Sequence, residues 1–153
     1  MNRDIILASK SKTRIKLLRS AGISFEAVAH SVDEEEVKMS MSANTPEEVV
    51  VKLAEMKALK LSMSNESAFV IGSDQGLDLK GQLVNKAQDR KEAKEQLMKM
   101  SGSVHTLITA TTVAHDNNII WKYVDRSKMH MRKLNEDLIE EYLNKVDDIF
   151  LIL

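Results

Sequence analysis

The sequence has no cysteine, so it contains neither a disulfide framework nor a thiolate metal site. Aromatic residues make up only 4% of the chain, and no interleaving of basic and aromatic residues occurs, which disfavours proteins that stack nucleic-acid bases. No apolar run is long enough to cross a bilayer, and the first residues, MNRDIILASK, lack the apolar core of a secretory signal. These absences predict a cytoplasmic protein that does not act at a membrane.

The charge balance excludes a further group of functions. Lys and Arg total 22 against 23 Asp and Glu, so the formal net charge of -1 gives no general attraction for a DNA or RNA polymer. The glycine-rich dinucleotide motif, the P-loop and the nucleophile elbow are all absent. At 153 residues the chain is the size of one domain, and we predict a single domain over residues 1–153.

Strand and helix patterns interleave along the whole chain. Apolar runs predict strands at 4–8, 23–30, 68–73, 104–114 and 119–124, a hairpin over 77–84 and one more strand at 127–132. Capping and spacing predict helices at 9–20, 45–63, 89–102 and 135–143, with starts at Thr45-Pro46-Glu47-Glu48 and at Asn135. The residues 115–118, His-Asp-Asn-Asn, predict a hairpin turn between two of the strands. The acidic stretch after Asp33 is expected to be an exposed loop. This order predicts an α/β fold with a mixed sheet and flanking helices.

Hydroxyls and cations follow the first predicted strand. Ser9, Ser11 and Arg14 lie where a strand passes into a helix, and backbone N–H groups at such a point suit a phosphate. The alternative is that a serine only caps the helix and that the basic residues form a solvated face.

Lys57 and Asp74 are two ionisable residues that occur within or next to apolar segments. Lys57 falls at the centre of the apolar stripe of its predicted helix, so it either extends to water, pairs with a carboxylate or points into a polar cleft. Asp74 is expected at the end of a strand, where it can hold a divalent metal, accept a proton from water or cap a turn. Glu34, in the acidic run, is either a second carboxylate of such a site or loop surface. The four histidines lack metal-ligand spacing, and we interpret all of them as structural or surface residues.

Five blocks in this order resemble the Maf family of nucleotide pyrophosphatases, once called septum formation proteins. The blocks are LASKSKTRIKLL, SVDEEEV, TPEEVVVKLAEMKA, VIGSDQGLDLKGQLVNKA and SGSVHTLITATTV. The resemblance implies a fold with a nucleotide-binding cleft between two lobes, a divalent metal (Mg²⁺ or Mn²⁺) and hydrolysis of a nucleoside triphosphate between its α and β phosphates. It leaves a homodimer open.

The resemblance also implies roles for individual residues. It matches Ser9, Ser11 and Arg14 to substrate binding, Glu34, Lys57 and Lys86 to catalysis, and Asp74 to the proton acceptor, with Asp74 and Glu34 as metal ligands. Thr13 and Gln75 are expected to set substrate specificity. Ser73-Asp74-Gln75 is similar to the subfamily active on 7-methyl-GTP, whereas Ser11-Lys12-Thr13-Arg14 and Asn85-Lys86-Ala87 depart from the family pattern.

Family members continue with a Gly-x-Tyr-x-Ile-x-Gly-like segment, and this sequence ends at Leu153 in an apolar run. We therefore expect a domain that lacks the usual carboxyl-terminal segment. Two other hypotheses follow: a nucleotide-binding protein with impaired catalysis, and a structural, septum-associated protein.

Overall fold

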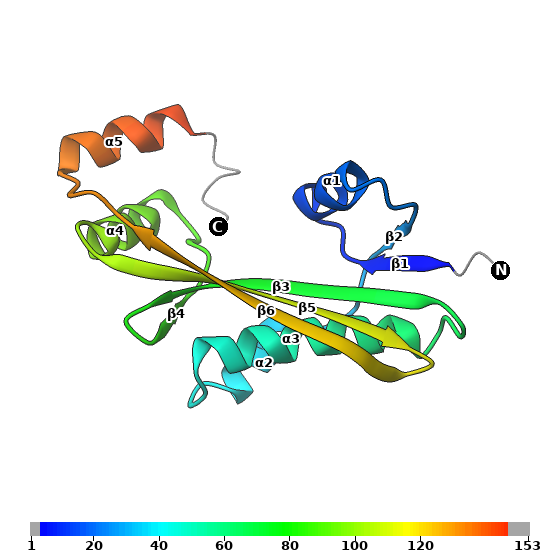
Figure 1. The fold of residues 1–153 in the computed structure, drawn as a ribbon. Coiled ribbons are helices and arrows are strands. Elements are labelled where there is room, and N and C mark those ends of the chain that lie inside the picture. Colours follow the sequence, from blue (N-terminus) through cyan, green and yellow to red (C-terminus); the bar gives the residue numbers. More distant parts are fainter. Residues whose placement is uncertain (1–3, 147–153) are drawn as a thin grey trace. The chain divides into compact units, whose positions relative to one another are not determined.

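The computed structural model describes residues 4–146, which contain five helices and a six-stranded mixed sheet (Figure 1). The tail from Asp147 onward, and with it the end of the chain, lies outside the described residues. The predicted α/β class with a mixed sheet and flanking helices is confirmed.

The strands are ordered β2-β1-β3-β5-β6, with β4 paired to β3. Strands β1 (Ile5–Ala8), β2 (Glu26–Val28) and β3 (Phe69–Leu79) run parallel, and β3 forms an antiparallel hairpin with β4 (Gln82–Val84). β5 (Val104–His115) and β6 (Asn118–His130) are joined by a turn in which Asp116 and Asn117 both have positive φ. Asn and Asp tolerate that conformation, so the predicted hairpin at this point is confirmed.

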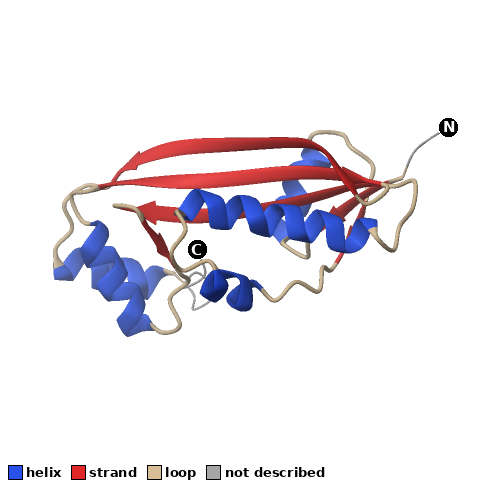
Figure 2. Cartoon of the chain, turned by 90° about the horizontal axis from the view of Figure 1, so that it is seen from below, coloured by secondary structure: helices blue, strands red, loops and turns tan. Residues whose placement is uncertain are grey.

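The helices are α1 (Lys12–Ser20), α2 (Glu34–Ser40), α3 (Pro46–Ser62), α4 (Arg90–Met100) and α5 (Glu136–Lys145). A capping box starts α3: the Thr45 side chain accepts from Glu48 N–H, and the Glu48 carboxylate accepts from Thr45 N–H. α3 extends along one face of the sheet in both views (Figure 2). The helix start predicted from Thr-Pro-Glu-Glu is therefore confirmed.

Three local predictions are wrong. The acidic stretch forms α2 instead of a loop, because the Asp33 carboxylate caps the helix by accepting from Glu36 N–H and the acidic first turn suits the helix dipole. Asp74 lies inside β3, which continues to Leu79 because it pairs with β4 there. Residues 127–132 form no separate strand, since β6 runs unbroken to His130.

The chain divides into two compact units, one of residues 1–75 and 108–125 and the other of 76–107 and 126–153. The core of the first includes Ile6, Ala8, Ala68 and Val70, and that of the second includes Ala93, Ile139 and Leu143. The single domain over residues 1–153 stays a prediction.

Strand β3 approaches α3 very closely in the first unit. A Cβ atom built on Gly72 would lie 2.3 Å from the carbonyl oxygen of Ala54 and 2.6 Å from the backbone nitrogen of Ala58. Only a residue without a side chain fits there, because the atoms in the way belong to the backbone. This contact sets the distance between the strand that carries Asp74 and the helix that carries Lys57.

Candidate active site

The parallel strands end at one level, and polar side chains follow directly. The register pairs Ala8 with Val28 and Leu7 with Ile71, so the ends of β1 and β2 lie level with Gly72. Ser9 directly follows β1, His30 comes two residues after the end of β2, and Asp74 lies two residues beyond Gly72 within β3. Although Asp74 does not end its own strand, it lies near the level at which the parallel strands β1 and β2 end, and open α/β sheets bind ligands at such ends.

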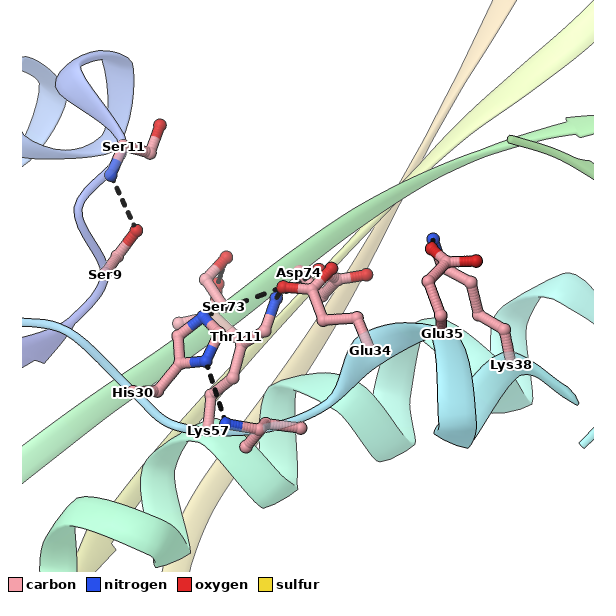
Figure 3. A network of polar contacts seen from close by, with 11 residues as sticks. Ser9, Ser11, His30, Glu34, Glu35, Lys38, Lys57, Ser73, Asp74 and Thr111 are labelled. Carbon is pink, nitrogen blue, oxygen red and sulfur yellow. Dashed lines mark hydrogen bonds and ion pairs between the residues drawn. The ribbon is translucent and has the colours of Figure 1, made fainter. Parts of the chain in front are cut away.

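The centre of the site is the ammonium of Lys57. Its Nζ atom lies 2.6 Å from Asp74 Oδ1 and 2.8 Å from Glu34 Oε1 (Figure 3). The Lys57 side chain is 1% exposed, and those of Asp74 and Glu34 are 10% and 37% exposed. Of the three readings that the sequence left open for Lys57, pairing with a carboxylate is correct, and it pairs with two.

Burial has different results for the two carboxylates. Burial raises the pKa of Asp74 above the ordinary value of an aspartate, and the neighbouring Glu34 charge adds to this, although Lys57 opposes both. Burial also acts to raise the pKa of Glu34, but the hydrogen bond and charge of Lys57, together with His30 and Lys38, outweigh it, so the Glu34 pKa is lowered. Asp74 is therefore the carboxylate whose affinity for a proton the site increases, which suits a general base.

The loop after β1 supplies hydroxyls and a guanidinium. Ser9 is buried, and its Oγ accepts from Ser11 N–H at 3.1 Å, while Ser11 Oγ caps α1 by accepting from Arg14 N–H at 3.4 Å. The capping role weighed for the serines is thus real for Ser11. Arg14 is close enough for its charge to lower the pKa of Asp74 and of His30.

Three further predicted residues, Thr13, Gln75 and Lys86, are exposed. Thr13 is exposed on the first turn of α1, and Gln75 is exposed on β3, where its amide Nε2 donates to Thr109 Oγ1 on β5 at 2.9 Å. Lys86 is exposed after β4 in the second unit. The structure does not test the specificity roles of Thr13 and Gln75 or the catalytic role of Lys86, and these stay predictions.

The sequence interpretation missed His30. Its side chain is 17% exposed, and Nε2 lies 3.6 Å from Glu34 Oε1. Burial lowers the pKa of His30, and the positive charges of Lys57 and Arg14 lower it further, against the opposing effect of Glu34 and Asp74. The signal was available, because His30 is the last residue of a predicted strand and precedes Glu34 by four residues.

A divalent cation fits this donor set only if substrate phosphates supply the rest of its ligands. No cluster of three or more His, Cys, Asp or Glu side chains able to hold a metal occurs within residues 4–146. Glu34 and Asp74 each use one oxygen for Lys57, so each retains a second carboxylate oxygen. Mg²⁺ is commonly held by one or two carboxylates together with substrate phosphates, and this pair meets that requirement.

Comparison with known proteins decides the family. The model of the family described as "Maf-like protein" matches residues 4–149. The chain belongs to the Maf family. The nucleoside triphosphate pyrophosphatase of Nitrobacter hamburgensis is 40% identical over 95% of this chain and 72% of its own length. The 7-methyl-GTP pyrophosphatase of Brucella suis is 40% identical over 99% of this chain and 77% of its own length.

A dITP/XTP pyrophosphatase of Mycobacterium abscessus is more remote. It is 15% identical, with a TM-score of 0.46, over 82% of this chain and 71% of its own. None of the described helices is long and apolar enough to cross a membrane.

Proposed function

We propose that this Maf protein is a nucleoside triphosphate pyrophosphatase, which converts its substrate to a nucleoside monophosphate and pyrophosphate. The carrying observation is the buried Lys57 ammonium held between the carboxylates of Glu34 and Asp74 at the carboxyl ends of parallel strands. The names of the relatives support the same reaction. Since nucleoside triphosphates are cytoplasmic metabolites, the proposal includes a cytoplasmic location.

In this proposal Asp74 is the general base. Its Oδ1 is held by Lys57, and Oδ2 takes the proton from the attacking water. The water oxygen forms a bond to the α phosphorus as the bond to the bridging oxygen breaks and pyrophosphate leaves. Lys57 keeps Asp74 in place and keeps positive charge near the phosphates, and Arg14 neutralises the leaving group.

A divalent cation completes the proposed site. Glu34 would hold Mg²⁺ or Mn²⁺ through Oε2 and Asp74 through Oδ1, so that Oδ2 of Asp74 stays available for the proton. The cation supplies Lewis-acid polarisation of a phosphoryl oxygen. Ser9, at the end of β1, and the start of α1 offer hydrogen-bond donors to the same phosphates.

The test is product analysis on a panel of nucleotides that includes dTTP, UTP, CTP, GTP, ITP and 7-methyl-GTP, each with Mg²⁺ or Mn²⁺. We expect pyrophosphate and monophosphate in equal amounts, and loss of turnover in Asp74→Asn. Asp78→Asn is the matched control on the same strand, since the Asp78 carboxylate accepts from Gly81 N–H in a turn. Release of inorganic phosphate, or full activity of Asp74→Asn, would contradict the proposal.

The alternative of a nucleotide-binding protein with impaired catalysis is not favoured by the comparisons. It predicts measurable nucleotide affinity by calorimetry without turnover. Sustained turnover on any nucleotide of the panel removes it.

A further inference from the structure

His30 is held in one orientation by the backbone beside it. Its Nδ1 atom accepts from Val32 N–H at 3.4 Å, so Nδ1 carries no proton. A neutral imidazole has one N–H group, and here that group must be Nε2–H. Nε2 is the atom that faces Glu34 Oε1, so the ring presents a donor to that carboxylate.

Two donors thus converge on one oxygen of Glu34. Lys57 Nζ lies 2.8 Å and His30 Nε2 lies 3.6 Å from the same Oε1 atom (Figure 3). Since Lys57 holds Oε1 and His30 lies beside the same atom, Oε2 is the carboxylate oxygen left available to a ligand. The longer contact needs a small rotation to become a hydrogen bond, and catalytic hydrogen bonds are commonly long before substrate binds.

Glu34 needs such a partner more than Asp74 does. Asp74 is held by a central strand of the sheet, whereas Glu34 is the first residue of α2, a helix of seven residues, and its side chain is 37% exposed. Without His30, Lys57 is the one contact found for the carboxylate within residues 4–146, and Lys57 also bonds Asp74.

We propose that His30 is a positioning residue that orients the Glu34 carboxylate through its Nε2–H group. The inference rests on the proposed function, because Glu34 is useful in this orientation only if the site binds a triphosphate. His30 itself touches neither the water nor the phosphates in this scheme.

The kinetic test compares two substitutions. His30→Leu keeps bulk but removes the donor, and we expect kcat to fall about tenfold with KM for the nucleotide little changed. His30→Gln places an amide N–H near the position of Nε2 and is expected to recover most of kcat. Equal loss in both variants, or a loss confined to KM, would overturn the proposal.

A double-mutant cycle separates positioning from general damage to the fold. In a Glu34→Gln background, His30→Leu is expected to change kcat by less than about twofold, because the group that His30 orients is already altered. An undiminished loss in that background would show that His30 does not act through Glu34.

An NMR measurement tests the inference even if the protein has no enzyme activity. In ¹⁵N NMR spectra of the full chain, with His30→Leu used to assign the signal, the His30 ring is expected as the Nε2–H tautomer, with a Nε2 resonance that shifts in Glu34→Gln. A Nδ1–H tautomer, or an Nε2 resonance indifferent to Glu34→Gln, would overturn the inference. If the wild-type protein hydrolyses no nucleotide, the proposed function fails and this arm still decides the contact.

Discussion

Lys57 Nζ lies 2.6 Å from Asp74 Oδ1, between two buried side chains 17 positions apart in the chain. Burying either charge alone is unfavourable, so each group makes the presence of the other tolerable. The pair joins the middle of α3 to β3. It therefore contributes both to the packing of the first unit and to its proposed chemistry.

The first prediction concerns this pair. Lys57→Met leaves Asp74 buried without its ammonium, and we expect the free energy of unfolding to fall by about 3 kcal/mol together with loss of turnover. The double variant Lys57→Met/Asp74→Asn should regain much of the stability but none of the activity. Urea unfolding measures the first effect, and pyrophosphate release measures the second.

Lys60→Met is the matched control, because Lys60 is exposed in the last turn of the same helix. Its unfolding free energy should stay within about 0.5 kcal/mol of the wild type. If Lys57→Met were equally harmless, the pair would not have the role given to it here.

The second prediction concerns the close approach of Gly72 to α3. In Gly72→Ala the new methyl group meets backbone atoms of Ala54 and Ala58, so β3 and α3 must move apart. We expect a stability loss of about 2 kcal/mol and a fall in kcat of at least about tenfold, since Lys57 and Asp74 separate with the two elements.

Gly102→Ala provides the comparison. Gly102 has φ of +65° in the second unit, and its added methyl group meets only the flexible side chain of Lys133, at 3.2 Å. The backbone conformation makes this change cost about 1 kcal/mol, with kcat unaltered. A Gly72→Ala enzyme that is destabilised yet keeps the wild-type kcat would argue against the geometric role of Gly72.

The third prediction is a pair of titrations in the metal-free protein. Carboxyl-carbon NMR, with Asp74→Asn and Glu34→Gln for assignment, should find the pKa of Asp74 above and the pKa of Glu34 below the ordinary values. Because the pKa of Glu34 is lowered on folding, its contribution to stability is present above the unfolded pKa and is lost as pH falls through the folded one. Asp74 has the opposite sign, so its ionisation weakens the folded state as pH rises.

Lys57 lowers the pKa of both carboxylates, and this allows a control within the same experiment. In Lys57→Met both groups should titrate at higher pH than in the wild type. An Asp74 that titrated at or below the usual pH of an aspartate would contradict the raised pKa and with it this support for Asp74 as the general base.

The fourth prediction concerns the cap of α2. Asp33 accepts from Glu36 N–H at 3.0 Å and so holds the helix that begins with Glu34. Asp33→Ala should weaken this short helix by about 1 kcal/mol and lower kcat/KM by about fivefold, because Glu34 spends less time in place. Asp33→Asn keeps the capping oxygen and should stay close to the wild type; equal activity of the alanine variant would show that the cap does not support the site.

Local rules were sufficient wherever the interaction is between neighbours in the chain. The capping box at Thr45 and Glu48, the turn at Asp116 and Asn117 and the cap at Asn135 all depend on residues a few positions apart, and each was predicted correctly. The helix after Asp33 shows the limit of such rules, because its composition resembles a solvated loop and only the cap distinguishes the two.

The full lengths of β3 and β6 could not be predicted from the sequence, for another reason. β3 continues past Asp74 because β4 pairs with Leu77 to Leu79, and β6 continues past Val124 as one strand to His130. Such extensions depend on partners that the local pattern does not reveal.

For the site, the sequence by itself determined that Lys57 lies at the centre of an apolar helix face, that Asp74 follows an apolar strand segment, and that the chain resembles the Maf family. Only the tertiary structure decided that one ammonium bonds both Asp74 and Glu34, and that His30 faces the same oxygen of Glu34. The physical reason is the register of three parallel strands and the close fit of Gly72 against α3, which bring residues distant in the chain to within hydrogen-bond distance.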